Sequence, residues 1–174
     1  YFDMQEEDIQ QIVQVNLTSV MVGTLYAYQI MKEQGSGLIV NISSMAGYMP
    51  SPAMAAYSAT KHALLGFTKS LSTEMKGSGT EIKAVCLGLI ESELLDKASV
   101  KHGHGSMFLD LIPMKPMPTE IATKKIIDKI SKKGLLIYVP TYARIYHHIQ
   151  YFIPSVILKG CLLYTSDAAD DLLC

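Results

Sequence analysis

The chain has 174 residues, of which 49% are hydrophobic and 18% are charged, and its formal net charge is −1. This length accommodates one domain with a hydrophobic core. The near-neutral charge gives no electrostatic reason to expect a nucleic-acid partner, and Arg144 is the only arginine. Three cysteines without metal-ligand or disulfide-framework spacing indicate a reducing, cytoplasmic setting.

The first predicted element is a long helix from about Glu6 to Glu33, whose apolar residues recur at helical intervals. Asn16 interrupts this apolar pattern, either as a solvent-facing side chain or as a polar relay or kink in the helix. A short apolar, β-branched run then predicts a buried strand over Leu38–Ser43. A second helix is expected from about Ala55 to Lys76, with a stripe of small residues on one face.

The second half of the chain continues the same alternation. Strands are predicted over Ile82–Leu87 and Leu135–Val139, with a basic amphipathic helix, Glu120–Lys133, before the second of them. The chain from Thr141 to about Lys159 is expected to be helical with a break near Pro154. Helices alternating with strands predict an α/β fold, with a parallel sheet covered by helices on both faces.

Two Tyr-x-x-x-Lys pairs occur in the sequence, Tyr28–Lys32 and Tyr57–Lys61, and the spacing alone does not distinguish them. In open parallel sheets, ligands bind beyond the carboxyl ends of the strands. Tyr57 follows the first strand closely, whereas Tyr28 lies near the end of the helix that leads into that strand. We therefore expect Tyr57 and Lys61 to be chemical and Tyr28 to pack. Ser44, directly after the strand, is expected to meet Tyr57.

Two longer stretches carry a resemblance to a known family. VNLTSVMVGTLYAYQIM and GSGLIVNISSMAGYMPSPAMAAYSATKHALLGFTKSLSTEM resemble the carboxyl-terminal half of a classical short-chain dehydrogenase/reductase, over roughly Asp3–Lys97. The resemblance implies a partial doubly wound, Rossmann-like parallel sheet whose amino-terminal half is missing. It also assigns the catalytic tetrad of the family to Asn16, Ser44, Tyr57 and Lys61.

The resemblance implies a role for each member of the tetrad. Tyr57 would exchange a proton with the substrate oxygen, and Ser44 would stabilise charge on that oxygen. Asn16 would hold a water that links Lys61 to solvent. An unperturbed tyrosine has a pKa of about 10, and a neighbouring cation lowers the pKa of an acid. We therefore expect Lys61 to lower the pKa of Tyr57.

The same resemblance implies an NAD(P)-dependent oxidoreductase, with NAD or NADP as cofactor and a small alcohol or ketone, possibly apolar, as substrate. Tyr57 and Lys61 would contact the nicotinamide ribose, and Gly88, Ile90 and Ser92 would bind the nicotinamide end. No metal site is expected. The family commonly pairs subunits through the two long helices, which implies a homo-oligomer.

Several alternatives remain open on the sequence. An epimerase or dehydratase of the extended branch shares the Tyr-x-x-x-Lys pair, and a non-catalytic scaffold could be built on the same fold. The Gly-rich turn that cradles a pyrophosphate does not occur in the sequence. We expect residues 1–160 to be the catalytic half of one domain, inactive and weakly cofactor-binding alone, and residues 161–174 to be a non-native tail.

The remaining candidate features are weaker. His102 and His104 supply only two metal ligands, and Cys86 is expected to be a buried, inert thiol. The methionine-rich segment from Met107 to Met117 either packs normally or forms an apolar lid over the substrate. The apolar run from Ile149 to Tyr164 is too short to span a bilayer. It could pack in the domain or lie on a membrane surface, and we favour packing.

Overall fold

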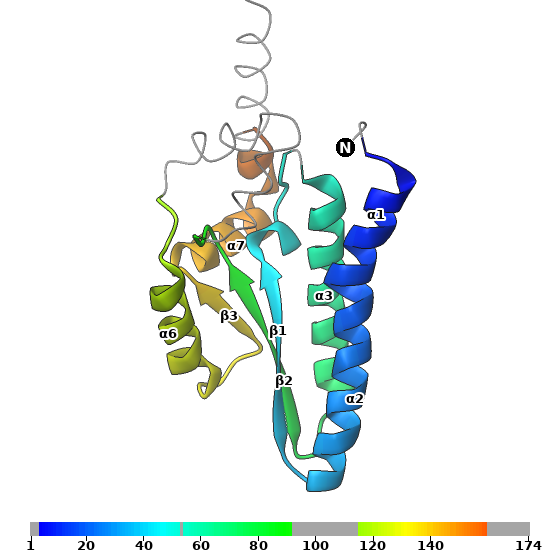
Figure 1. Ribbon diagram of the computed structural model, residues 1–174. Coiled ribbons are helices and arrows are strands. Elements are labelled where there is room, and N and C mark those ends of the chain that lie inside the picture. The colour runs from blue at the N-terminus through cyan, green and yellow to red at the C-terminus, as the bar shows by residue number, and fades with distance from the viewer. Residues whose placement is uncertain (1–3, 53, 92–114, 160–174) are drawn as a thin grey trace, which may run out of the picture.

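The computed structural model describes residues 4–52, 54–91 and 115–159. Within these segments, one all-parallel sheet has the order β1-β2-β3, formed by β1 (Gly37–Ser44), β2 (Thr80–Leu87) and β3 (Leu136–Val139). Figure 1 shows α6 (Thr119–Ile130) on one side of the sheet, with α2 (Ser19–Gln34) and α3 (Ala55–Glu74) on the other. The predicted parallel α/β fold with helices on both faces is confirmed.

The predicted first helix is present as one continuous helix with an irregular middle. It consists of α1 (Glu6–Val13), a π-helical turn (Gln14–Thr18) and α2. A capping box between Gln5 and Asp8 starts it, with the Gln5 N–H donating to the Asp8 carboxylate at 3.1 Å. Gly35, at a φ of 73°, adopts the left-handed conformation that ends a helix at low cost.

Apolar side chains of α2 and α3 pack against the β1–β2 half of the sheet. Ile39, Met75 and Ile82 form the buried centre of this cluster, and Tyr28 packs against it. The prediction that Tyr28 packs is therefore confirmed. Cys86 belongs to a neighbouring cluster on the same face and is fully buried, as predicted.

A buried polar network joins both helices to the sheet. Thr24 of α2 donates to the Asn41 side-chain oxygen at 3.3 Å, and the Asn41 amide donates to the Thr68 hydroxyl of α3 at 3.0 Å. Thr68 in turn donates to the Leu64 carbonyl at 2.8 Å. Because buried polar groups are costly when unpaired, this network fixes α2 and α3 relative to β1.

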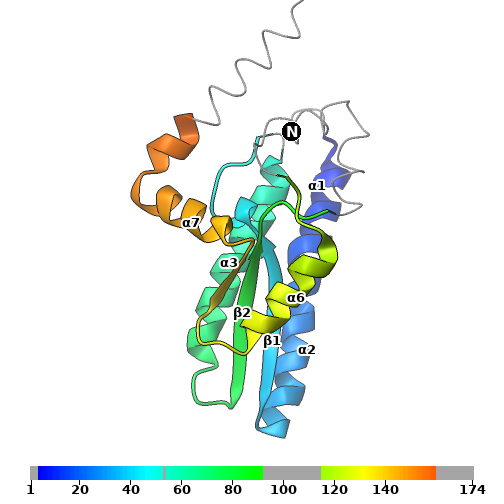
Figure 2. The ribbon, with the colours of Figure 1, turned by 90° about the vertical axis from the view of Figure 1, so that its left-hand side faces the viewer.

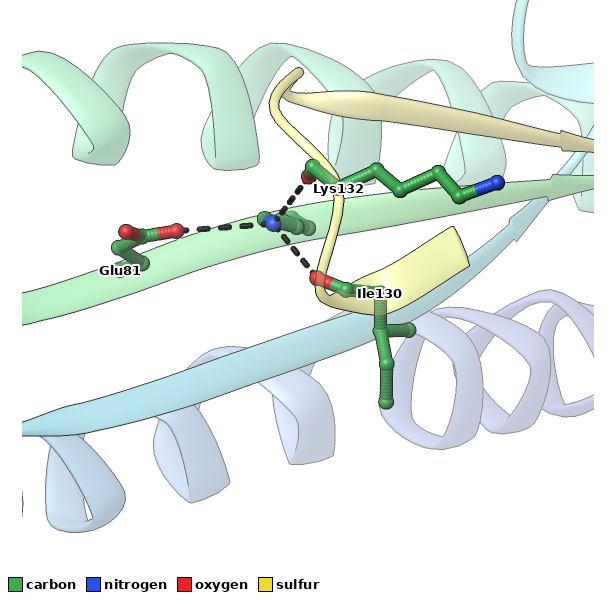
Figure 3. A network of polar contacts seen from close by, with 4 residues as sticks. Glu81, Ile130 and Lys132 are labelled. Atoms are coloured by element: carbon green, nitrogen blue, oxygen red, sulfur yellow. Dashed lines mark hydrogen bonds and ion pairs between the residues drawn. The ribbon is translucent and has the colours of Figure 1, made fainter. Parts of the chain in front are cut away.

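A buried lysine anchors α6 on the opposite face (Figure 3). The Lys83 ammonium, on β2, donates to the carbonyl oxygens of Ile130 at 2.6 Å and Lys132 at 2.8 Å, and its distance to the Glu81 carboxylate is 3.5 Å. The last carbonyls of a helix have no partner within the helix. Lys83 supplies donors for carbonyls at the end of α6, and so fixes the connection into β3.

The predicted last helix is α7 (Tyr142–Phe152), followed after Ile153 by a short helical segment over 154–159. Ala143 is the buried residue of α7, and Tyr146 packs against the core. Tyr151 and Phe152 are exposed, and the end of the described chain turns away from the sheet (Figure 2).

The favoured packing of the run that begins at Ile149 is therefore wrong for most of its described part, where Ile157 alone is buried. The physical reason is that α7 contacts the core through the start of the helix, and the chain breaks direction after Phe152. In the described segments, no helix has the length and apolar composition that crossing a membrane requires.

Candidate active site

The three strands end side by side at one edge of the sheet. In the pairing register, Ser44 lies opposite Leu87, and Leu87 lies opposite Val139. The first turn of α3 and the loop that follows β2 therefore start from the same edge. This is the edge at which parallel sheets bind ligands.

Ser44 and Tyr57 meet at this edge. Ser44 is the last residue of β1, and Tyr57 lies in the first turn of α3, where a hydrogen bond from the Ser58 hydroxyl to the Ala46 carbonyl at 2.8 Å ties the two elements together. The Ser44 hydroxyl accepts a hydrogen bond from the Ala46 N–H at 3.2 Å. Its side chain also acts on the Tyr57 phenol, whose pKa it lowers. Ser44 thus both caps the strand end and contacts the tyrosine.

Lys61 lies one turn further along α3 and is held at both ends. Its carbonyl accepts a hydrogen bond from the Ser43 hydroxyl at 3.2 Å, and its ammonium donates to the Ile42 carbonyl at 3.0 Å. The ammonium lies 5.5 Å from the centroid of the Tyr57 ring. The residue is only 8% exposed, so β1 fixes its position beside the tyrosine.

The pKa values of this pair depart from the expectation that Lys61 lowers that of Tyr57. Burial raises the pKa of Tyr57, and the hydrogen bond with Ser44 opposes this only in part. Burial lowers the pKa of Lys61. That expectation is therefore wrong, because removal from water disfavours both the phenolate and the ammonium.

Asn16 lies in the π-helical turn, and this turn packs against α3. Its side-chain amide donates to the Ile12 carbonyl at 3.1 Å. In an uninterrupted α-helix that carbonyl would accept from the backbone N–H of Asn16. Asn16 is partly buried, so the helix-kink alternative fits and a purely solvent-facing side chain does not. Its role as a relay remains a proposal.

The loop after β2 is held from two sides. The Gly88 N–H donates to the Val139 carbonyl at 2.8 Å, and Met117 pairs with the loop through hydrogen bonds of 3.0 Å to the Leu89 carbonyl and from the Glu91 N–H. This pairing is a parallel bridge between Ile90 and Met117. It uses the backbone groups that flank Ile90, so the N–H and C=O of Ile90 have no hydrogen-bond partner among the described residues.

Sequence reasoning missed Tyr142, the first residue of α7. Its hydroxyl accepts a hydrogen bond from the Leu89 N–H at 2.9 Å. A Cβ added to Gly88 would lie 2.7 Å from this hydroxyl and 3.0 Å from Pro140, so Gly88 leaves the room that Tyr142 occupies. No local pattern marks a contact between residues this far apart in the chain.

The other candidate features of the sequence lie partly inside and partly outside the described residues. Met117 packs against the cluster around Val85, whereas Met107–Met114, the two histidines of the metal hypothesis and Ser92 lie outside the described residues. Burial raises the pKa of the Cys86 thiol to about 12, which is consistent with an inert cysteine. In the described segments, no group of three or more potential ligands could hold a metal ion.

Comparison with known proteins places this site in a family. A 3-oxoacyl-[acyl-carrier-protein] reductase of Synechocystis is 35% identical over a stretch that covers 68% of this chain and 47% of the relative. An uncharacterized oxidoreductase of Thermotoga maritima is 37% identical over a stretch that covers 76% of this chain and 47% of the relative. The solved structure of acetoin dehydrogenase from Enterobacter cloacae matches with a TM-score of 0.62 and 28% identity over 80% of this chain and 56% of that one.

The chain spans about half the length of these relatives. Another solved structure, a short-chain dehydrogenase from Sphingobium yanoikuyae in complex with NADPH, shares the fold with a TM-score of 0.68 at 21% identity, over 93% of this chain and 59% of that one. The family model described as short chain dehydrogenase matches residues 2–102. This chain therefore belongs to the short-chain dehydrogenase family.

Proposed function

We propose that the protein is an NAD(P)-dependent oxidoreductase that interconverts an alcohol and a ketone, with Asn16, Ser44, Tyr57 and Lys61 as its catalytic residues. One observation carries the proposal: at the carboxyl edge of the sheet, the ammonium of the buried Lys61 lies 5.5 Å from the centroid of the Tyr57 ring, and Ser44 at the end of β1 lowers the pKa of the Tyr57 phenol. The loop after β2 starts from the same edge, so the proton donor and the loop that would bind the nicotinamide lie in one region.

The residues present fit the nicotinamide end of such a cofactor. An ammonium group has three N–H donors. In the described part of the chain, Lys61 uses one of them on the Ile42 carbonyl, which leaves two for ribose hydroxyls. The N–H and C=O of Ile90, which have no partner among the described residues, offer the donor and acceptor that a carboxamide requires. Gly88 and Ser92 complete the proposed contacts. The cofactor, when bound, supplies or accepts the hydride.

The protein's own groups handle the proton. In the direction of reduction, Tyr57 would donate its phenolic proton to the substrate oxygen; in the direction of oxidation, it would accept the alcohol proton. The hydrogen bond from Ser44 stabilises the phenolate and can equally stabilise charge on a substrate oxygen. Asn16 would hold a water that links Lys61 to solvent and supplies protons.

The test is Tyr57→Phe, made in the protein at its full natural length. Turnover of secondary alcohols with NAD and NADP should fall by about 10²–10⁴-fold, because Phe keeps the ring but has no proton to transfer. Binding of NADH or NADPH should change little. Tyr28→Phe is the matched control, since Tyr28 has the same spacing to a lysine but packs in the core. It should retain turnover.

Near-normal activity of Tyr57→Phe would refute the assignment. Binding of NAD(P)H by the parent without any turnover across a panel of alcohols and ketones would favour the non-catalytic scaffold instead. The substrate class, alcohols and ketones, follows from the proton donor and the cofactor fit.

We also propose a homo-oligomer in a reducing compartment such as the cytoplasm. The free Cys86 thiol is consistent with such a compartment. Exposed apolar side chains on α2, among them Leu25, Tyr26 and Ile30, support pairing of subunits through this helix. Ala63 and Gly66 on α3 are exposed and small, and would allow close approach of a second subunit.

A further inference from the structure

Tyr142 connects α7 to the loop that would hold the nicotinamide. Its hydroxyl is the acceptor for the Leu89 N–H at 2.9 Å, while the Leu89 carbonyl accepts from the Met117 N–H at 3.0 Å. Both backbone groups of Leu89 are therefore occupied from outside the loop. The next residue, Ile90, is left with its own N–H and C=O unpaired among the described residues.

The contact with Tyr142 also explains why residue 88 is a glycine. A Cβ there would lie 2.7 Å from the Tyr142 hydroxyl oxygen and 2.9 Å from its ring, which real side chains do not tolerate without a shift. Burial raises the pKa of Tyr142, so its hydroxyl stays protonated and neutral near pH 7. The phenol ring packs edge-on against Tyr146, with 6.2 Å between the ring centroids, and this fixes its orientation.

We propose that Tyr142 is a positioning residue, which sets the orientation of loop 88–91 so that Ile90 presents its N–H and C=O to the nicotinamide carboxamide. This inference rests on the proposed function. Tyr142 itself touches the loop and not the reacting atoms. Loss of its hydroxyl frees the Leu89 N–H and lets the peptide plane between Gly88 and Leu89 rotate, which shifts the chain that leads into Ile90.

The first test uses this chain and needs no cofactor. Tyr142→Phe keeps the ring and removes only the acceptor, so the Leu89 amide should exchange its hydrogen about two- to tenfold faster, the usual range for one neutral hydrogen bond. Tyr146→Phe is the matched control on the same helix, because no hydrogen bond of its hydroxyl is present among the described residues. It should leave Leu89 exchange unchanged.

The second test compares two ligands on the protein at its full natural length. NADH or NADPH, whichever binds the parent more tightly, should bind Tyr142→Phe about two- to tenfold more weakly. ADP-ribose, or its 2′-phosphate for NADPH, lacks the nicotinamide and should bind both proteins equally. A general loss of structure would weaken both ligands, so equal weakening overturns the positioning role.

Gly88→Ala supplies a variant on the other side of the contact. Its new methyl group would displace Tyr142 or the loop, so NAD(P)H binding should weaken. In the Tyr142→Phe background the hydroxyl is already gone, and the added effect of Gly88→Ala should be smaller than in the parent. Strictly additive effects would contradict coupling between the two residues.

The outcomes separate this inference from the proposed function. If the parent binds NAD(P)H and turns over while Tyr142→Phe binds it equally well, the positioning role is wrong and the proposed function stands. If the parent at full natural length binds no NAD(P)H, both fail, and faster Leu89 exchange would then describe a purely structural clamp.

Discussion

The anchor of α6 gives a quantitative test of the fold. Lys83 is 5% exposed, and its ammonium donates to the carbonyls of Ile130 at 2.6 Å and Lys132 at 2.8 Å. Lys83→Met keeps an unbranched side chain of similar length and removes both donors. We expect the variant to be less stable because the end of α6 loses its capping group.

The magnitude follows from three opposing contributions. A hydrogen bond from a charged donor contributes about 1.5–3 kcal/mol, so the loss of two has a gross cost of about 3–6 kcal/mol. Methionine avoids the cost of burying an ammonium, and water can reach the exposed turn over residues 131–134 and replace the lost donors. We expect a net loss of about 2 kcal/mol, which lowers Tm by about 4–8 °C in a chain of this size.

Urea unfolding followed by circular dichroism measures this free energy. Lys132→Met is the matched control, because Lys132 contributes only its carbonyl to the network and Figure 3 shows its side chain extending away from it. This control should stay within about 0.5 kcal/mol of the parent. Glu81→Gln should also be nearly neutral, since that carboxylate is 72% exposed. A free energy of unfolding equal for Lys83→Met and Lys132→Met would refute the capping role.

Two further predictions concern the buried interior. Thr68→Val removes the acceptor of the Asn41 amide and should cost about 1–3 kcal/mol in urea unfolding, whereas Thr73→Val, exposed on the same helix, should be nearly neutral. Burial raises the pKa of both Cys86 and Tyr138 to about 12, above the values of about 8.5 and 10 in an unfolded chain. Between about pH 9 and 12 the unfolded chain therefore binds fewer protons, and stability should fall as pH rises. Cys86→Ala should flatten this fall in unfolding curves taken from pH 8 to 10.5, and a slope equal to that of the parent would contradict the linkage.

Periodicity and glycine placement predicted the described helices and strands to within a few residues. These signals are local: apolar residues at helical spacing mark α3, and Gly35 in the left-handed conformation ends α2. The order of these elements then specifies a parallel sheet, since each strand is followed by a crossover. The tetrad assignment came from motif resemblance, and the structure brings Ser44, Tyr57 and Lys61 to one edge.

What escaped prediction depends on contacts distant in sequence. The Leu89–Tyr142 hydrogen bond joins the loop after β2 to the start of α7, and the two meet only because β2 and β3 pair in one register. Whether the pKa of Tyr57 is raised or lowered depends on burial, which the spacing of residues in the sequence does not reveal. The π-helical turn around Asn16 arises from a one-residue change in hydrogen-bond partner, and helix propensity does not encode such a change.

The two Tyr-x-x-x-Lys pairs have the same spacing but lie in different surroundings in the fold. Tyr28 lies in the half of α2 that approaches the start of β1, where Ile39, Met75 and Ile82 surround it with apolar side chains. Tyr57 lies where β1 has just ended, so the strand offers Ser44 and the Ile42 carbonyl as polar partners for it and its lysine. Backbone and side-chain polar groups at the carboxyl end of a strand are available for hydrogen bonds. The first residues of a helix that begins there can make these bonds. At the other edge, the same four-residue spacing places Tyr28 against the apolar core and leaves Lys32 exposed.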